Sequence, residues 1–179
     1  PTFTFVASVS CGEFLGMEPV LIDCGKDNFH LNINDIEKHL KQDSSIKAII
    51  PVHFAGYQVN MNDLFDLAEK YNIFVLEDAA HMIGHRTPKN NLRYKNYAQA
   101  YSFYANKNIT TLGEGGALTT DDEDLAIKVR RLSLHGITKD GWDRFAGGKW
   151  EYDVLDLGFK YNMPDIAASF GLWQLSKMD

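Results

Sequence analysis

Two residues of this sequence, Asp78 and Lys107, carry groups that could act together on a bound cofactor. Asp78 ends the apolar run 73–78, and Lys107 follows shortly after an apolar stretch that contains Ser102. In open α/β sheets, ligands bind beyond the carboxyl ends of the strands, so both side chains could reach one crevice. A lysine amine forms an imine with an aldehyde, and a carboxylate holds a proton on a ring nitrogen; pyridoxal phosphate (PLP) chemistry needs both. Taken alone, a Lys–Asp pair is more often a salt bridge, and an aspartate at a strand end is also a common helix cap.

Histidines and cysteines offer a metal site as a competing possibility. His81 and His85 are four residues apart, a spacing that can hold zinc on a helix. The residues between them are Met-Ile-Gly, so the glutamate of a His-Glu-x-x-His site is absent and a structural role is expected instead. Cys11 and Cys24 fit no zinc pattern, and two reduced thiols of a cytosolic protein are expected. The sequence therefore predicts no metal cofactor.

The elements that must position these residues alternate between apolar runs and helical patterns. Short strands are expected at residues 3–7, 20–23, 46–52, 73–78, 101–103 and 117–120. Helices are expected to start near Asn34, at Asn60 or Asn62, at Asp121 or Asp122, and at Pro164, because residues of these types begin helices. This order predicts an α/β fold, with a mainly parallel sheet and helices on both of its faces.

The last part of the chain reads differently. Residues 134–160 are irregular and rich in glycine, tryptophan and charge, which is typical of a long functional loop. The final helix is expected to turn its large apolar residues inward, namely Ile166, Phe170, Trp173 and Leu175.

The composition is that of an ordinary globular domain. The chain has 179 residues, of which 45% are hydrophobic and 23% are charged, enough for one domain with a core. The net charge is −6 and no basic run is present, so nucleic acid is not expected as a partner. No apolar run is long enough to span a bilayer, and no leader-like segment opens the chain, so no membrane and a cytoplasmic location are expected.

Five segments resemble one family, in the family's order and from end to end of the chain. Residues 77–81 (EDAAH) and 102–116 (SFYANKNITTLGEGG) closely resemble two signature segments of the DegT/DnrJ/StrS-type sugar aminotransferases, which are PLP enzymes of fold type I. Residues 4–7 (TFVA), 51–56 (PVHFAG) and 157–168 (LGFKYNMPDIAA) resemble three further segments. Each is weak alone, and the ordered set is a strong signal.

The resemblance assigns the two chemical roles to the residues already singled out. Lys107 matches the Schiff-base lysine, and Asp78 matches the partner of the pyridine nitrogen. A relative that acts as a dehydratase has histidine at the lysine position, so Lys107 favours transamination.

The resemblance also implies residues that hold the cofactor. Ser102 matches a hydroxyl that binds the phosphate, and Phe5 matches an aromatic that stacks on the ring, although its pattern alone suits a core residue. His81 occupies the place of a glutamine or histidine near the phenolic oxygen, and a structural histidine is the alternative. Asn162 matches an asparagine that reaches the neighbouring subunit's phosphate across a homodimer interface, or else it only precedes the last helix.

The function implied is amino transfer from glutamate to a nucleotide-linked keto sugar at C4, for surface polysaccharide or lipid sugars. The alternatives are a related PLP enzyme of the same fold with another substrate, or a non-catalytic truncated fragment. Residues 1–179 match only the central part of the PLP-binding large domain. The N-terminal phosphate-binding segment and the C-terminal small domain of the family are expected to be absent from this chain.

Overall fold

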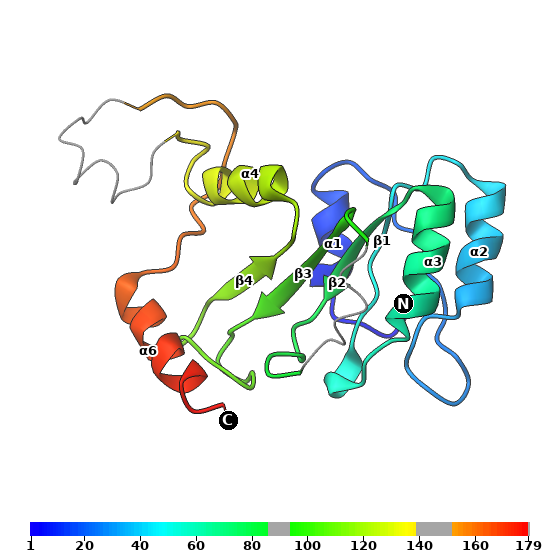
Figure 1. Cartoon of the computed structure of the whole chain (residues 1–179), viewed down its shortest axis with the longest axis horizontal. Coiled ribbons are helices and arrows are strands. Elements are labelled where there is room, and N and C mark those ends of the chain that lie inside the picture. Colours follow the sequence, from blue (N-terminus) through cyan, green and yellow to red (C-terminus); the bar gives the residue numbers. More distant parts are fainter. Residues whose placement is uncertain (86–93, 139–151, 179) are drawn as a thin grey trace.

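The computed structural model describes residues 1–85, 94–138 and 152–178, and a four-stranded sheet lies at its centre (Figure 1). The strands are hydrogen-bonded in the order β1-β2-β3-β4. The first three are parallel, and β4 is antiparallel to β3. The mainly parallel α/β sheet expected from the sequence is therefore confirmed. The strand bounds are β1 Ala48–Ile49, β2 Phe74–Asp78, β3 Tyr97–Ser102 and β4 Gly116–Thr119.

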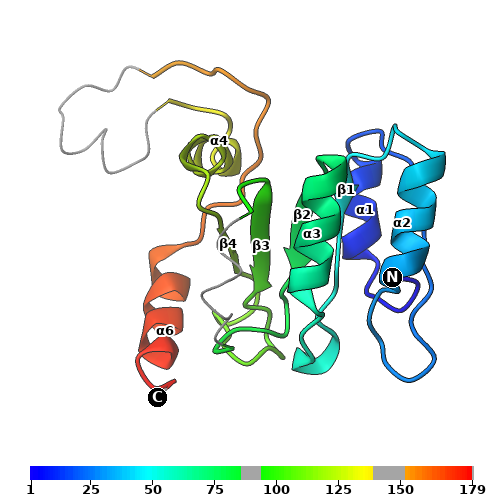
Figure 2. The same cartoon turned by 45° about the vertical axis from the view of Figure 1, so that its right-hand side comes forward.

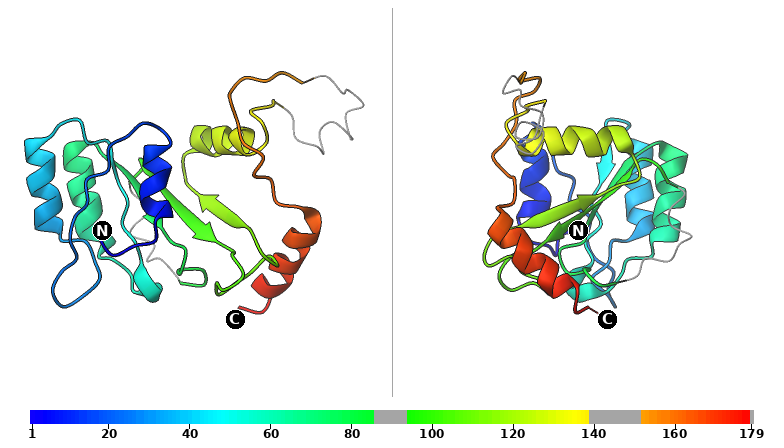
Figure 3. Two further views of the ribbon diagram at one scale, coloured as in Figure 1. Left: turned by 180° about the vertical axis from the view of Figure 1, so that it is seen from behind. Right: turned by 60° about the vertical axis from the view of Figure 1, so that its left-hand side comes forward.

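Helices cover both faces of this sheet. α2 (Ile33–Gln42) and α3 (Met61–Tyr71) lie on one face, and α1 (Ala7–Glu13) lies on the other, as the front and back views show (Figures 1 and 3). α4 (Glu123–Ser133) follows β4. α6 (Asp165–Leu175) is the last helix of the described residues.

The core lies between α3 and the sheet. Leu64 and Ala68 are one helical turn apart and fully buried, as is Val75 of β2. Residues at i and i+4 share one face of a helix, so this apolar spacing selects the face that packs on the sheet. Phe65 packs edge-on against Tyr97, with ring centroids 5.1 Å apart, which holds α3 over β3.

The expectation of a strand at residues 3–7 is wrong, because a helix takes over that segment. Ala7 is the first residue of α1, and the carbonyls of Phe5 and Val6 accept hydrogen bonds from backbone N–H groups of the helix. A strand needs a ladder of hydrogen bonds to a neighbouring strand. The apolar composition of a short segment does not reveal whether such a neighbour exists.

The expectation of a strand at residues 20–23 is wrong, and the strand expected at 46–52 is shorter than predicted, because these segments also lack a full ladder of bonds to a neighbouring strand. Residues 20–23 lie outside the strands of the described chain, and Ile22 accepts a bond from the Thr2 N–H at 2.9 Å. Of residues 46–52, two form β1, and Val52 adds an isolated parallel bridge to Asp78. The strand expectations at 73–78 and 117–120 agree with β2 and β4, and the one at 101–103 captures only the end of β3.

Helix α2 begins earlier than expected. Its N-cap is Asn32, whose side-chain oxygen accepts a hydrogen bond from the backbone N–H of Asn34 at 3.0 Å. Asn34, which the sequence suggested as the cap, is an exposed residue of the first turn. Ile36 and Leu40 are buried, as the helical spacing predicts.

We expect Asn32→Ala to lower the free energy of unfolding by about 1 kcal/mol, because the first turn loses the side chain that caps it. Asn34→Ala is the matched control and is expected to change that free energy by less than about 0.5 kcal/mol. Urea denaturation of both variants measures the difference. Equal losses would contradict the placement of the cap.

The two later helices start where expected, but the second faces differently. Asp122 caps α4 by accepting from the Leu125 N–H at 3.0 Å, and α6 starts after Pro164. The inward orientation expected for α6 is wrong, since its contacts run through the buried Ala167 and through Gln174, which bonds the backbone of Thr110. Apolar residues occupy all sides of this helix, so their spacing could not select a face. The large ones are exposed at Ile166, Trp173 and Leu175, and Phe170 is half-buried.

Of the expected loop 134–160, residues 139–151 lie outside the described residues. The remainder is irregular and is tied together by two antiparallel bridges, Leu134 to Lys160 and Ile137 to Val154. In the described ranges, none of the helices has both the length and the apolar composition that a bilayer span requires.

Candidate functional site

A cavity of about 890 Å³ opens at the carboxyl ends of β2 and β3. These neighbouring parallel strands end side by side (Figure 2). The N-terminal segment, the start of α1, the 3-10 turn Phe54–Gly56 and the loops after β2 and β3 form its walls. This is the location at which open α/β sheets bind ligands. Five of the six residues that the sequence suggested for the site line the cavity: Phe5, Asp78, His81, Ser102 and Lys107.

The Asp78 carboxylate is held in position by both of its oxygens. The Ser8 hydroxyl donates to Oδ2 at 2.6 Å, and the Ala80 N–H donates to Oδ1 at 3.2 Å. Ser8 belongs to the first turn of α1, so this helix reaches across from its own face of the sheet to the end of β2. The Asp78 side chain is thus fixed in the cavity by two hydrogen bonds, and nothing in the sequence indicated that Ser8 donates one of them.

The Lys107 amine lies against His81 in the same cavity. Lys107 Nζ is 3.0 Å from His81 Nε2, and the opposite ring nitrogen, Nδ1, accepts the Ala55 N–H at 3.2 Å. Burial chiefly lowers the pKa of His81; the Lys107 charge lowers it further, and the Asp78 carboxylate raises it. The amine and the carboxylate thus both act on the pKa of His81, and all three side chains line the same cavity.

Asn162 lies apart from the other five residues. It is exposed, is not among the residues that line the cavity, and accepts a hydrogen bond from Lys160. Phe5 does line the cavity and is 77% exposed. The core position that its pattern alone suggests is thus wrong for Phe5 in this chain.

The two histidines of the possible zinc pair engage different partners. His85 Nε2 is 3.0 Å from Gln58 Oε1, whereas His81 Nε2 faces Lys107. The Nε2 atoms of both rings thus face other side chains instead of a shared ligand position.

A polar network is centred on Glu77, the residue before Asp78, and the sequence did not suggest it. Glu77 is fully buried and accepts hydrogen bonds from Tyr97 at 2.6 Å, from Gln99 at 2.8 Å and from His53 Nε2 at 2.8 Å. Burial raises the pKa of Glu77, but the bonds from His53, Tyr97 and Gln99 together lower it below its ordinary value. Successive strand residues point to opposite faces. The Glu-Asp pair at a strand end could thus have indicated one carboxylate for the site and one for the interior.

Replacing Glu77 with alanine is expected to lower the free energy of unfolding by about 3–5 kcal/mol, because the buried donors of His53 and Tyr97 and the half-buried amide of Gln99 lose their common acceptor. Glu77→Gln keeps one acceptor oxygen and the side-chain volume, so its loss should be smaller. Glu69→Ala, an exposed glutamate on α3, is the control. Urea denaturation compares the three variants, and a loss at Glu77→Ala no larger than at Glu69→Ala would refute the structural role of the network.

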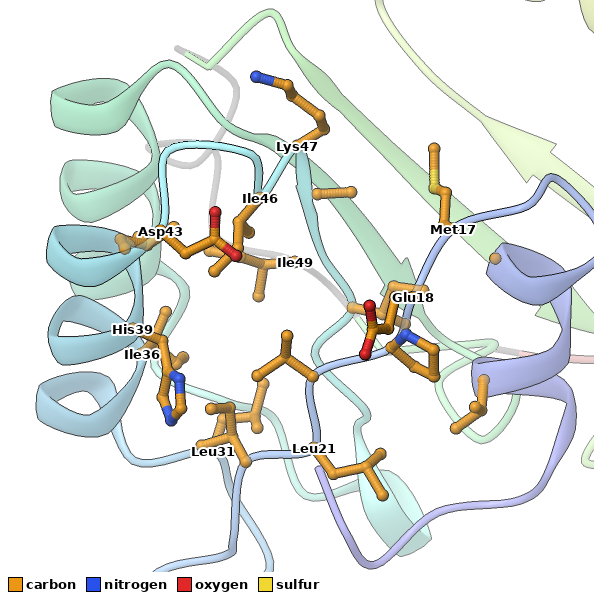
Figure 4. A pocket seen from close by; sticks show the side chains of 18 of the residues that line it. Met17, Glu18, Leu21, Leu31, Ile36, His39, Asp43, Ile46, Lys47 and Ile49 are labelled. Carbon is orange, nitrogen blue, oxygen red and sulfur yellow. The ribbon is translucent and has the colours of Figure 1, made fainter.

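A second cavity, of about 440 Å³, lies near the free edge of β1 (Figure 4). Leu21, Leu31, Ile36 and Ile49 give it an apolar lining, with His39 and Asp43 of the α2 end at its side. None of the six sequence-suggested residues lines it. The candidate site is therefore the first cavity.

Comparison with known proteins gives a consistent picture. A family model described as the DegT/DnrJ/EryC1/StrS aminotransferase family matches residues 1–179. The chain is 41% identical over 177 residues to the spore coat polysaccharide biosynthesis protein SpsC of Bacillus subtilis, covering 98% of this chain and 45% of that protein. It is 39% identical over 179 residues to the UDP-4-amino-4-deoxy-L-arabinose–oxoglutarate aminotransferase of Shewanella sediminis, covering 99% of this chain and 45% of that protein.

The fold has solved counterparts as well. Spr1654 of Streptococcus pneumoniae, described as a sugar aminotransferase in its PMP form, superposes with a TM-score of 0.85 at 33% identity, over 99% of this chain and 49% of that one. The chain thus spans about half the length of the proteins it matches.

Proposed function

Because the chain belongs to the DegT/DnrJ/EryC1/StrS aminotransferase family, we propose that it forms the cofactor-binding centre of a PLP-dependent sugar aminotransferase. The observation that carries this proposal is the shared cavity of the Asp78 carboxylate and the Lys107 amine, at the ends of neighbouring parallel strands. The PMP form of Spr1654 supports the choice of cofactor. We place residues 1–179 in the central part of the large domain, as the sequence resemblance implies.

The two chemical roles follow from what the side chains offer. When bound, the cofactor supplies an aldehyde carbon and a ring that accepts electrons from the reacting carbon. Lys107 offers the amine that joins the aldehyde, and a base that moves a proton between the substrate and cofactor carbons. Asp78 offers a carboxylate held by the Ser8 and Ala80 donors, which suits a partner that keeps a proton on the ring nitrogen.

The remaining cavity residues fit the binding of the cofactor. Ser102 Oγ accepts from the Tyr104 N–H at 3.3 Å, so the Ser102 hydroxyl hydrogen can donate to a phosphate. The exposed ring of Phe5 offers a face for stacking on the cofactor, and His81 is the proposed partner of the phenolic oxygen. We propose that Asn162 serves the neighbouring subunit's phosphate in a homodimer, consistent with its exposed position outside the cavity.

The proposed substrates are glutamate and a nucleotide-linked 4-keto sugar for a surface polysaccharide or lipid. The Shewanella relative is named for a UDP-linked 4-amino sugar and for oxoglutarate, the keto acid that corresponds to glutamate. SpsC is named for spore coat polysaccharide biosynthesis. A cytoplasmic location is proposed as well, because Cys11 and Cys24 are free thiols, as a reducing compartment would keep them.

The test supplies the protein with PLP, glutamate and a panel of UDP-linked 4-keto, UDP-linked 3-keto and free keto sugars. We expect oxoglutarate to form in proportion to a 4-amino UDP-sugar, detected by mass spectrometry. Oxoglutarate without any aminated sugar would indicate a PLP enzyme for another substrate. An absence of PLP binding would indicate a non-catalytic chain and would overturn the proposal.

A further inference from the structure

Two hydroxyl groups connect the N-terminal segment to Asp78 by a hydrogen-bond chain. Thr4 Oγ1 lies 2.7 Å from Ser8 Oγ, and the Ser8 hydroxyl donates to Asp78 Oδ2 at 2.6 Å. The first contact spans the start of α1, whereas the second joins residues 70 positions apart in the sequence. Both contacts are half-buried, and all three residues line the same cavity. The hydrogen-bond chain thus runs from the first residues of the protein to the end of β2.

The direction of this hydrogen-bond chain follows from the number of hydrogens. A hydroxyl group has one hydrogen and two lone pairs, and a carboxylate only accepts. Since Ser8 gives its hydrogen to Asp78, the Ser8 oxygen must accept at its other contact, and Thr4 is the donor. Both hydrogens therefore point toward the carboxylate, an arrangement in which each bond polarises and strengthens the next.

Two donors from different parts of the fold set the plane of the Asp78 carboxylate. Oδ2 accepts from Ser8 of α1, and Oδ1 accepts from the Ala80 N–H in the turn after β2. A length of 2.6 Å is typical of a hydroxyl bonded to a carboxylate, and such bonds are stronger than those between neutral groups. Only the Ser8 bond of the two comes from a side chain, so a substitution can remove it selectively.

The same segment carries the aromatic ring proposed to stack on the cofactor. Phe5 lies between Thr4 and Ser8 in the sequence, and its exposed ring lines the cavity. A pyridine ring that stacks on Phe5 and meets Asp78 at its nitrogen would depend on residues 4–8 for both contacts. The N-terminal segment therefore couples the placement of the ring to the placement of its carboxylate partner.

We propose that Thr4 and Ser8 are positioning residues, whose hydrogen-bond chain holds the Asp78 carboxylate in the orientation that binds a ligand with a ring N–H. This inference rests on the proposed function, under which that ligand is the pyridine ring of PLP. Ser8 acts on the carboxylate directly, and Thr4 acts through Ser8 by holding its oxygen. Loss of the Ser8 hydroxyl should therefore weaken the contact at the ring nitrogen more than loss of the Thr4 hydroxyl.

The experiment compares the binding of PLP with that of 1-deaza-PLP, in which a C–H group replaces the ring nitrogen. Both compounds carry the phosphate and the aldehyde that joins Lys107, so the ratio of their affinities isolates the contact with Asp78. We expect Ser8→Ala to weaken the binding of PLP by about tenfold and Thr4→Val by about threefold, because a hydrogen bond to a charged group contributes more than one between neutral groups. The affinity for 1-deaza-PLP should change by less than about twofold in both variants.

Two matched variants serve as controls for the loss of a hydroxyl. Thr4→Ser keeps the donor, and Ser10→Ala removes a hydroxyl from the same helix at a residue that is not among those lining either cavity. Both should bind PLP within about twofold of the unmodified protein. Equal effects of Ser8→Ala on the two compounds, zero included, would overturn the proposal. Tighter binding of PLP by Ser8→Ala would overturn it as well, since the hydroxyl would then only compete for the charge of Asp78.

A double-mutant cycle without PLP tests the hydrogen-bond chain itself. Thr4→Val should lower the equilibrium constant of folding by about fivefold when Ser8 is present, the value of one neutral hydrogen bond, and by less than about twofold in the Ser8→Ala background. Urea denaturation measures both, and equal losses in the two backgrounds would overturn the link between Thr4 and Ser8. If the unmodified protein bound neither PLP nor 1-deaza-PLP, the proposed function would fail and the cycle would still decide the hydrogen-bond chain, so the two failures are distinguishable.

Discussion

Replacing Lys107 with alanine is expected to abolish the absorbance band that PLP gives with the protein, and to reduce amine transfer by at least about 10³-fold. The variant loses both the nucleophile that binds the aldehyde and the base that moves the proton, and general acid–base catalysis alone typically contributes about 10²–10⁴-fold. An absorbance titration with PLP and the oxoglutarate assay measure the two losses.

Two matched variants separate chemistry from charge. Lys107→Arg keeps the positive charge near His81 but lacks a nucleophilic amine, so it should be as inactive as Lys107→Ala. Lys128→Ala removes an exposed lysine of α4 and should behave as the unmodified protein. Retention of the band in Lys107→Ala would show that another amine carries the cofactor.

Asp78→Asn is expected to lower the transfer rate by about 30-fold or more and to weaken PLP binding. Removing one partner of a buried charge pair costs about 2–5 kcal/mol, and a neutral amide no longer favours a protonated ring nitrogen. The side chain keeps its shape: its amide oxygen can still accept from the Ala80 N–H, and the Ser8 hydroxyl can turn to accept from the new NH2 group. Steady-state kinetics and a PLP binding isotherm give the two quantities.

The control is Asp66→Asn, which replaces an exposed carboxylate on α3. It should leave the transfer rate and the affinity for PLP unchanged. If Asp78→Asn kept a rate within about twofold of the unmodified protein, the carboxylate would have no part in activating the ring. Asp78 would then be only a strand-terminal residue held by Ser8.

The sequence predicted those elements whose apolar residues recur at a regular spacing because they are buried against the core. The apolar run that becomes β2 and the spacing of Leu64 and Ala68 in α3 each reflect burial against the same core. Residues 3–7 misled because their composition suits a strand while their hydrogen bonds are those of a helix start. α6 misled because apolar residues surround it, so no stripe marks the face that packs.

Some groups of the site could likewise be predicted from the sequence, and others could not. Positions after apolar runs pointed to Asp78 and Lys107, the resemblance to the family added His81, and the fold brings all three to one cavity. The groups that hold them are a helix hydroxyl at Ser8 and a backbone N–H at Ala55. Their partners lie far away in the sequence, so only tertiary packing creates these contacts, and a backbone N–H has no residue identity to read.

Covalent trapping tests the account most directly. The protein is incubated with PLP, reduced with borohydride and digested, and the pyridoxyl-bearing peptides are identified by mass spectrometry. We predict that the pyridoxyl group is found on Lys107 as the dominant site and that Lys107→Arg abolishes it without moving it to another lysine. A label spread over exposed lysines, or absent from Lys107, would contradict the assignment of this cavity as the cofactor site.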